Sequence, residues 1–120
     1  MTSKIIMAKD ADGIIEKWAS QSRRVCFAAC FGDLAWHVRW VGPMSGGESG
    51  RWIQVVDETT NVLFTDQYDE IILTEDEELV GIRFRHPKGF TTAGFEINIF
   101  IDKQGDIDRE SESLLDRMTH

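Results

Sequence analysis

The sequence predicts an α+β domain in which an N-terminal helix packs on a twisted antiparallel meander sheet of about six strands. Near the N-terminus the apolar residues recur at helical spacing, and from residue 25 onward they recur at every second position. Two pairs of these alternating segments can be aligned as hairpins, and most links between segments are short. The length of 120 residues suits a single domain spanning 1–120.

The helix is predicted from its capping residues and from its apolar face. Asp10 or Asp12 can cap its N-terminus, and Arg23 and Arg24 are expected in its last turn, where cations interact well with the helix dipole. Its inward-facing residues are predicted to be Ile14, Ile15, Trp18 and Ala19.

The first hairpin joins Val25–Phe31 to Leu34–Val41. Gly32 and Asp33 between them are typical of a two-residue type II′ turn, which pairs residues whose numbers add up to 65. This register places the apolar side chains on one face and leaves Cys26, Cys30, His37 and Arg39 on the other face.

The middle of the chain alternates between turns and shorter strands. The segment 42–50 contains four glycines and is expected to be a flexible loop, long enough to act as a lid. A bend or bulge at Asp66 and Gln67 is expected to separate the last two strands of this region. The predicted elements are a strand at 51–57, a turn at 58–61, and strands at 62–65 and 68–74.

The second hairpin joins Leu79–His86 to Phe95–Asp102. Pairing residues whose numbers add up to 181 aligns the apolar side chains on one face. On the opposite face this register places Arg83 opposite Asn98 and Arg85 opposite Glu96.

The C-terminal segment is compatible with two predictions. Ser111–Met118 can form a short capped helix, or Asp106–Arg109 can add one more strand before it. The apolar face of the sheet must be covered either by the N-terminal helix or by closure into a partial barrel.

The charge is concentrated in the second half of the chain. The sequence has 13 Lys and Arg against 21 Asp and Glu, and the excess of eight negative charges lies entirely in residues 61–120. An acidic balance argues against nucleic-acid binding, and no apolar run is long enough to span a membrane. The acidic half serves either solubility or contact with a basic partner surface.

The sequence predicts neither a phosphate-binding loop nor a disulfide. The segment 42–49 has P-loop spacing, but Glu48 stands where the motif needs lysine. On one strand Cys26 and Cys30 lie about 13 Å apart, too far for a disulfide. We therefore expect a reduced, cytoplasmic protein whose two thiols form a groove for the N-terminal helix.

The sequence indicates no metal site and no cofactor. His37, His86 and His120 do not have metal-ligand spacing, and no nucleophile stands beside an evident base. Asp102, Asp106 and Asp108 alternate as in a calcium loop but lack its remaining ligands.

Two groups of residues remain as candidate sites. Trp36, Trp40 and Trp52 form either an aromatic core or the lining of a ligand cavity, with His37 and Arg39 as its polar groups. Gln54 is the expected hydrogen-bond partner for a buried indole. The candidate acidic interaction surface is the turn that contains Glu75, Asp76, Glu77 and Glu78.

The absence of a catalytic motif and the segregated charge favour a non-enzymatic interaction module. Such an adaptor, inhibitor or assembly subunit is expected to use its acidic face to bind a basic protein surface. The alternative is a small-molecule-binding or catalytic domain with the aromatic cavity as its site. A homodimer joined through an exposed sheet face or edge is compatible with either hypothesis.

Overall fold

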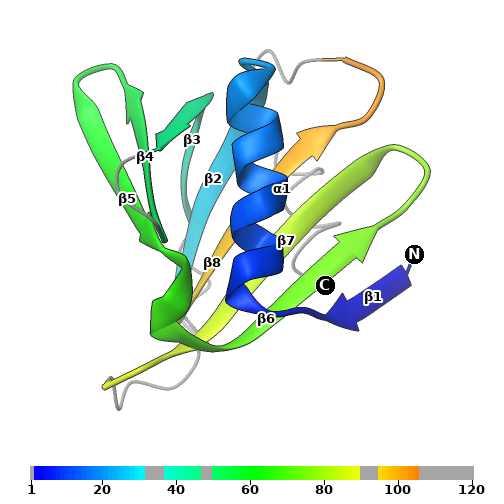
Figure 1. Ribbon diagram of the computed structural model, residues 1–120. Coiled ribbons are helices and arrows are strands. Elements are labelled where there is room, and N and C mark those ends of the chain that lie inside the picture. The colour runs from blue at the N-terminus through cyan, green and yellow to red at the C-terminus, as the bar shows by residue number, and fades with distance from the viewer. Residues whose placement is uncertain (1, 32–36, 47–49, 90–94, 106–120) are drawn as a thin grey trace.

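A 13-residue helix crosses one face of an eight-stranded antiparallel sheet (Figure 1). The structure is a computed structural model, and it describes residues 2–31, 37–46, 50–89 and 95–105. We call the face of the sheet that carries the helix the inner face and the opposite face the outer face. The α+β class is as predicted, and the helix covers the sheet, which does not close into a barrel.

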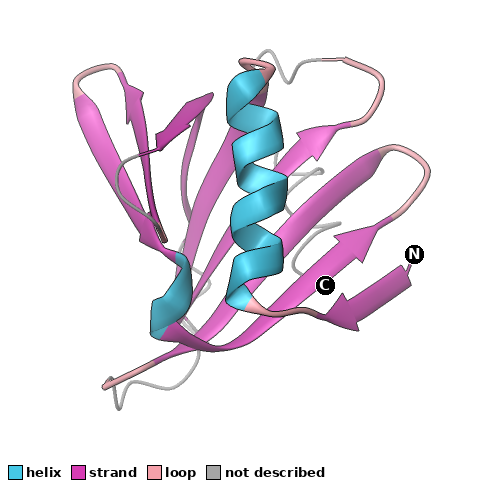
Figure 2. Cartoon of the chain, in the orientation of Figure 1, coloured by secondary structure: helices cyan, strands magenta, loops and turns pink. Residues whose placement is uncertain are grey.

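The described part of the chain contains one α-helix, one short 3-10 helix and eight strands (Figure 2). Their bounds are β1 Thr2–Ile5, α1 Ala8–Ser20, β2 Arg24–Phe31, β3 His37–Gly46, β4 Arg51–Val56, β5 Thr59–Phe64, η2 Thr65–Gln67, β6 Tyr68–Glu75, β7 Leu79–Pro87 and β8 Phe95–Asp102. The C-terminal helix predicted at 111–118 and the alternative strand at 106–109 lie outside the described residues.

The strand order is β1-β6-β7-β8-β2-β3-β4-β5, which differs from the single meander predicted. Two meanders, β2 to β5 and β6 to β8, are joined through the pairing of β2 with β8. The chain bends at Asp66 and Gln67 as predicted, but β6 does not continue beside β5. Instead η2 leads the chain past the N-terminal end of α1 to the other half of the sheet (Figure 1).

Helix α1 begins at Ala8, earlier than predicted. The Asp10 carboxylate accepts a hydrogen bond from the Met7 backbone N–H at 3.3 Å, so Asp10 acts from the first turn of the helix. The helix ends at Ser20, and Arg24 already belongs to β2. The prediction that Arg23 and Arg24 form its last turn was therefore wrong. The buried face of the helix is formed by Ala11, Ile15 and Trp18.

Strands β2 and β3 pair with numbers that add up to 67, two more than predicted. Phe27 lies opposite Trp40, and Cys30 lies opposite His37. A shift of two residues keeps every side chain on its predicted face, so the face assignment was right although the register was wrong. The predicted turn at Gly32 and Asp33 lies outside the described residues.

Strand β3 extends through most of the segment that was predicted to be a loop. Its last three residues pair with β4, and Met44 lies opposite Gln54. Gly42 allows this close packing, because a Cβ atom at this position would lie 2.7 Å from Cγ2 of Val56. Residues 42–46 of the predicted lid therefore belong to β3, and residues 47–49 lie outside the described residues.

The turn between β4 and β5 consists of Asp57 and Glu58, not of the predicted segment 58–61. Val56 pairs with Thr59, and both turn residues have positive φ angles, 48° and 68°. These angles are typical of a type I′ hairpin turn.

The hairpin of β7 and β8 has the predicted register. Ile82 lies opposite Ile99, and Arg85 lies opposite Glu96, so the paired numbers add up to 181. Tyr68 pairs with Pro87 at the start of the adjoining β6–β7 ladder, and its ring lies 5.5 Å from that of Phe84.

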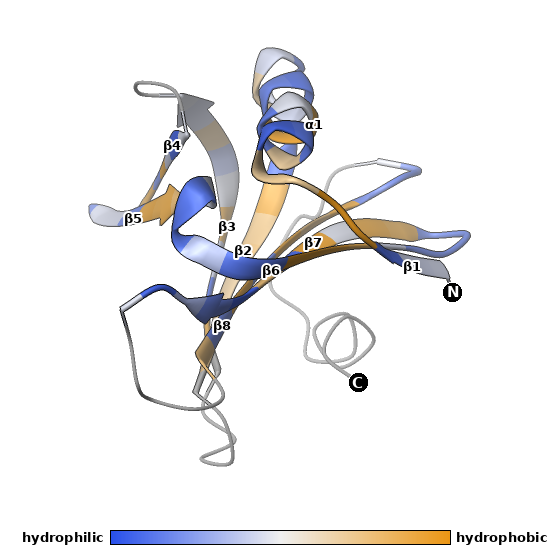
Figure 3. Ribbon diagram, turned by 60° about the horizontal axis from the view of Figure 1, so that its bottom comes forward, coloured by the Kyte–Doolittle hydropathy of each residue, from blue (hydrophilic) through white to orange (hydrophobic). Residues whose placement is uncertain are grey.

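Two clusters of buried side chains lie on opposite faces of the sheet. The larger cluster joins α1 to inner-face residues such as Val25, Phe27 and Phe84. In Figure 3 the helix stands to one side of the sheet, above this apolar face. Within the described residues no helix is long and apolar enough to cross a membrane.

The smaller cluster lies on the outer face, which was predicted to be solvated. It consists of Cys26, Ala28, Val41, Leu79 and Phe100. Cys26 and Cys30 are buried thiols that form no disulfide, and they face away from α1. The predicted groove for the helix was therefore wrong, because odd-numbered β2 residues, and not the two cysteines, lie beneath the helix.

Candidate functional site

The tryptophans that the structure describes have core positions. Trp40 packs edge-on against Phe27, with ring centroids 6.4 Å apart. Trp52 is buried, and its indole N–H donates to Oδ1 of Asp12 at 2.9 Å. The partner of this indole is therefore Asp12, and not Gln54 as predicted. Trp36 lies outside the described residues.

The Gln54 side chain instead joins three strands from within the core. Its amide Nε2 donates to the carbonyl oxygens of Val25 and Gly42 at 2.8 and 2.9 Å, and its Oε1 accepts from Asn61 at 3.3 Å. Because Gln54 is fully buried, these bonds replace the water that its amide loses on folding.

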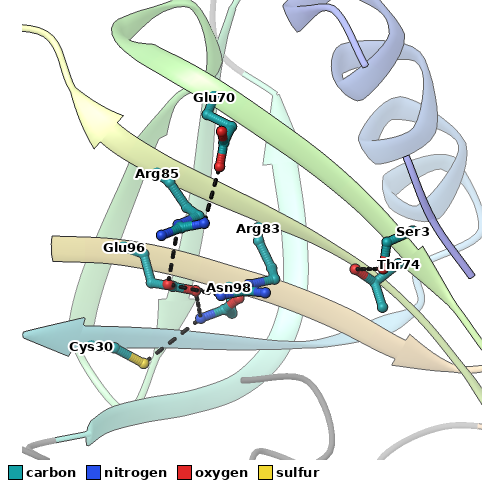
Figure 4. A network of polar contacts seen from close by, with 8 residues as sticks. All are labelled: Ser3, Cys30, Glu70, Thr74, Arg83, Arg85, Glu96 and Asn98. Atoms are coloured by element: carbon teal, nitrogen blue, oxygen red, sulfur yellow. Dashed lines mark hydrogen bonds and ion pairs between the residues drawn. The ribbon is translucent and has the colours of Figure 1, made fainter. Parts of the chain in front are cut away.

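A network of polar side chains crosses four strands of the outer face (Figure 4). Arg83 holds Glu96 through two hydrogen bonds, from Nε at 3.0 Å and from Nη2 at 3.1 Å. Arg85 lies 3.0 Å from Glu70 and 3.7 Å from Glu96, so the predicted Arg85–Glu96 pair is present. Asn98 donates to Glu96 at 2.9 Å and to the Cys30 sulfur at 3.7 Å.

The network shifts the acidity of two of its members. Burial raises the pKa of Glu96, but hydrogen bonds from Arg83 and Asn98 and the charges of Arg83 and Arg85 outweigh burial, and the pKa lies below its ordinary value. Burial raises the pKa of the Cys30 thiol, and the negative charge of Glu96 raises it further. A thiol with a raised pKa is a poor nucleophile, so Cys30 is not expected to act as one.

The two polar residues predicted to serve an aromatic cavity lie on β3. His37 opens this strand opposite Cys30, and Arg39 lies opposite Ala28. On the outer face β2 and β8 separate these positions from Arg83 and Arg85. Among the described residues no group of three or more His, Cys, Asp or Glu side chains is arranged to hold a metal ion.

Two carboxylates of the acidic turn between β6 and β7 have partners within the chain. Glu75 forms an ion pair with Lys103 at 2.5 Å. The Asp76 carboxylate accepts hydrogen bonds from the backbone N–H groups of Glu78 and Leu79, both at 2.7 Å. An aspartate whose side chain accepts hydrogen bonds from the backbone of its own turn stabilises that turn, so Asp76 has a structural role. Glu77 and Glu78 are exposed.

A cavity of 340 Å³ lies at the β1 edge of the sheet, away from Trp40 on β3 and Trp52 on β4. It is lined by Thr2, Ser3, Lys4, Leu73 and Glu75. Its lining is divided between polar and apolar groups and brings together no catalytic pair.

The outer face of the β4–β5 hairpin exposes a patch of apolar side chains. Val55 is 56% exposed, Val62 is 39% exposed and Phe64 is 47% exposed. Ile53 is half-buried and pairs with Val62, so it connects the patch across the two strands. We call these four residues the β4–β5 surface.

The two ends of the β4–β5 surface carry opposite charge. Arg51, which is exposed, begins β4 and pairs with Phe64. Asp57 and Glu58 form the exposed turn at the other end of the hairpin. Asp66 lies close to Gly50, which precedes Arg51, because a Cβ atom on Gly50 would lie 3.8 Å from Cγ of Asp66. Its carboxylate accepts a hydrogen bond from Gln67 at 3.3 Å.

The sequence shows apolar residues on both faces of β5, but it does not show which of these faces is left uncovered. Strand β5 places Val62 and Phe64 on the face opposite to the buried Leu63. An outward face of a solvated hairpin is expected to be polar. An apolar residue on both faces of an edge strand therefore marks a surface that a partner can cover.

No protein-family model and no curated protein sequence matches this chain. Among solved structures the chain is similar in fold to ChuX, with a TM-score of 0.55 and 13% identity over 88% of this chain and 68% of that chain. It is also similar to a protein from Erwinia carotovora, with a TM-score of 0.56 and 10% identity over 97% of this chain and 71% of that chain. These likenesses concern the fold alone.

Proposed function

We propose that this chain is a non-enzymatic protein-interaction module whose contact surface is the β4–β5 surface. The observation that carries this proposal is the exposure of Val55, Val62 and Phe64 on the same face of one hairpin. Covering contiguous apolar side chains removes them from water, which is the main favourable term in protein association.

The acidic turn supports the same class of function less strongly. Glu75 and Asp76 have partners within the chain, so the run Glu75–Glu78 offers fewer free carboxylates than its sequence indicates. Glu77 and Glu78 are the exposed carboxylates of this turn that a basic partner protein would contact. In that case binding weakens steeply as salt is raised, whereas apolar contact does not.

The proposal can be tested by photo-crosslinking in cells that naturally produce the protein. A photoreactive residue at position 62 or 64 is expected to form one discrete protein adduct, and a second change, Val55→Asp, is expected to abolish it. Position 16 on the exposed side of α1 is the matched control. Equal adducts from position 16, or none from positions 62 and 64, would contradict the proposal.

A further inference from the structure

We infer that the β4–β5 surface binds the same surface of a second copy of this chain, face to face about a two-fold axis. The inference rests on the proposed function, because it names the partner of that surface. Sheets that pack face to face are separated by about 10 Å and keep their strands roughly aligned. A two-fold contact uses one patch on both subunits, so the patch must be complementary to itself.

The apolar centre of the surface meets this requirement. Its outer-face residues Ile53, Val55, Val62 and Phe64 carry no charge, and Thr60 is the polar member of the same face. Two copies therefore bring no like charges together at the centre of the contact. This matters in a chain with a net charge of −8, because elsewhere two copies repel each other.

The ends of the surface select the orientation. With the hairpins antiparallel across the axis, Arg51 of one copy lies over the turn that contains Asp57 and Glu58 of the partner subunit. The long arginine and glutamate side chains can bridge the spacing between the sheets. With the hairpins parallel, Arg51 would face Arg51 and the two acidic turns would face each other. Charge complementarity thus favours a second copy in the antiparallel arrangement.

Light scattering on purified full-length protein tests the inference. At high micromolar concentration we expect a mass of twice 13.7 kDa, which falls toward a single chain on dilution. Val62→Lys is expected to leave the protein monomeric, and Val62 is sufficiently exposed for the variant to fold, which circular dichroism checks. Glu77→Arg is the matched control, because it changes charge at an exposed site outside the surface.

A charge swap tests the orientation. Arg51→Glu and Glu58→Arg are each expected to weaken dimerisation by roughly three- to tenfold, because each creates a pair of like charges. The double variant is expected to restore most of the loss, since it recreates both pairs with their signs reversed. Glu58 has a positive φ angle that strains arginine and glutamate alike, so the swap changes charge and little else.

The possible failures can be told apart. A wild-type protein that stays monomeric at all concentrations overturns the second-copy inference, and so does a dimer that Val62→Lys leaves intact. Failure of the double variant to recover overturns the antiparallel arrangement. If the crosslink from position 62 joins a different protein, the inference fails while the proposed function stands. If neither position 62 nor position 64 gives an adduct, both fail.

Discussion

The carboxylate of Asp12 on α1 accepts the indole N–H of Trp52 on β4 at 2.9 Å. The same oxygen, Oδ1, accepts the hydroxyl of Thr65 at 2.7 Å. One carboxylate oxygen therefore joins the helix, the β4–β5 hairpin and the 3-10 turn that leads to β6. Through its bond to Trp52, this oxygen also connects the hairpin that carries the β4–β5 surface to α1.

Replacement of Asp12 by alanine is expected to lower the free energy of unfolding by about 1–3 kcal/mol. The buried indole N–H of Trp52 and the hydroxyl of the fully buried Thr65 lose their common acceptor. Asp12→Asn keeps an acceptor oxygen and should cost clearly less. Urea denaturation followed by tryptophan fluorescence measures both changes, and equal losses for the two variants would argue against this role of the carboxylate oxygen.

The same substitution is expected to have opposite effects at two glycines. Gly42→Ala places a methyl group 2.7 Å from Val56 and should destabilise the protein by roughly 1–3 kcal/mol. Gly13→Ala has no atom within 4 Å and lies inside α1, so it should stabilise the protein by about 0.5–1 kcal/mol. Thermal unfolding compares them, and Val56→Ala should partly rescue Gly42→Ala.

The stability is expected to fall at acidic pH partly through Glu96. Its pKa in the folded protein lies below the ordinary glutamate value of about 4.3, so the folded state favours the charged carboxylate. This contribution is present above pH 4.3 and is lost as the pH falls through the lowered pKa. Glu96→Gln should be less stable than wild type at neutral pH and should lose stability less steeply on acidification. Parallel slopes for the two proteins would refute the assignment.

The thiol of Cys30 is expected to react slowly with a thiol-specific reagent in the native protein. Burial and the charge of Glu96 both disfavour its thiolate, and Cys26 is also buried. Both thiols should react quickly in denaturant, and a cysteine introduced at the exposed position 55 should react quickly in native protein. Rapid native labelling of Cys30 would show that the outer face opens readily.

Within the acidic turn, Asp76 and Glu77 are expected to respond differently to alanine. Asp76→Ala removes the acceptor for two backbone N–H groups and should destabilise the protein by about 1 kcal/mol. Glu77→Ala should leave the stability nearly unchanged, since its side chain is exposed. Chemical denaturation distinguishes the two, and a large loss of stability for Glu77→Ala would contradict the exposed position of this side chain.

Local periodicity in the sequence was sufficient to predict the α+β class, one helix and the faces of the strands. The register of β7 and β8 was also predictable, because a single alignment brings Ile82 opposite Ile99 and Arg85 opposite Glu96. Strand β1 was not predicted from periodicity, because none of its four residues is buried and the strand has no apolar face.

Only the tertiary structure decided the strand order, the role of Asp12 and the exposure of the β4–β5 surface. Periodicity shows which residues share a face, but the pairing of β2 with β8 joins segments about 70 residues apart and depends on packing across the whole core. The partner of Trp52 was missed for the same reason, because Asp12 lies 40 residues away along the chain. Burial and exposure are properties of the assembled layers, and no local pattern specifies which side of an edge hairpin those layers leave uncovered.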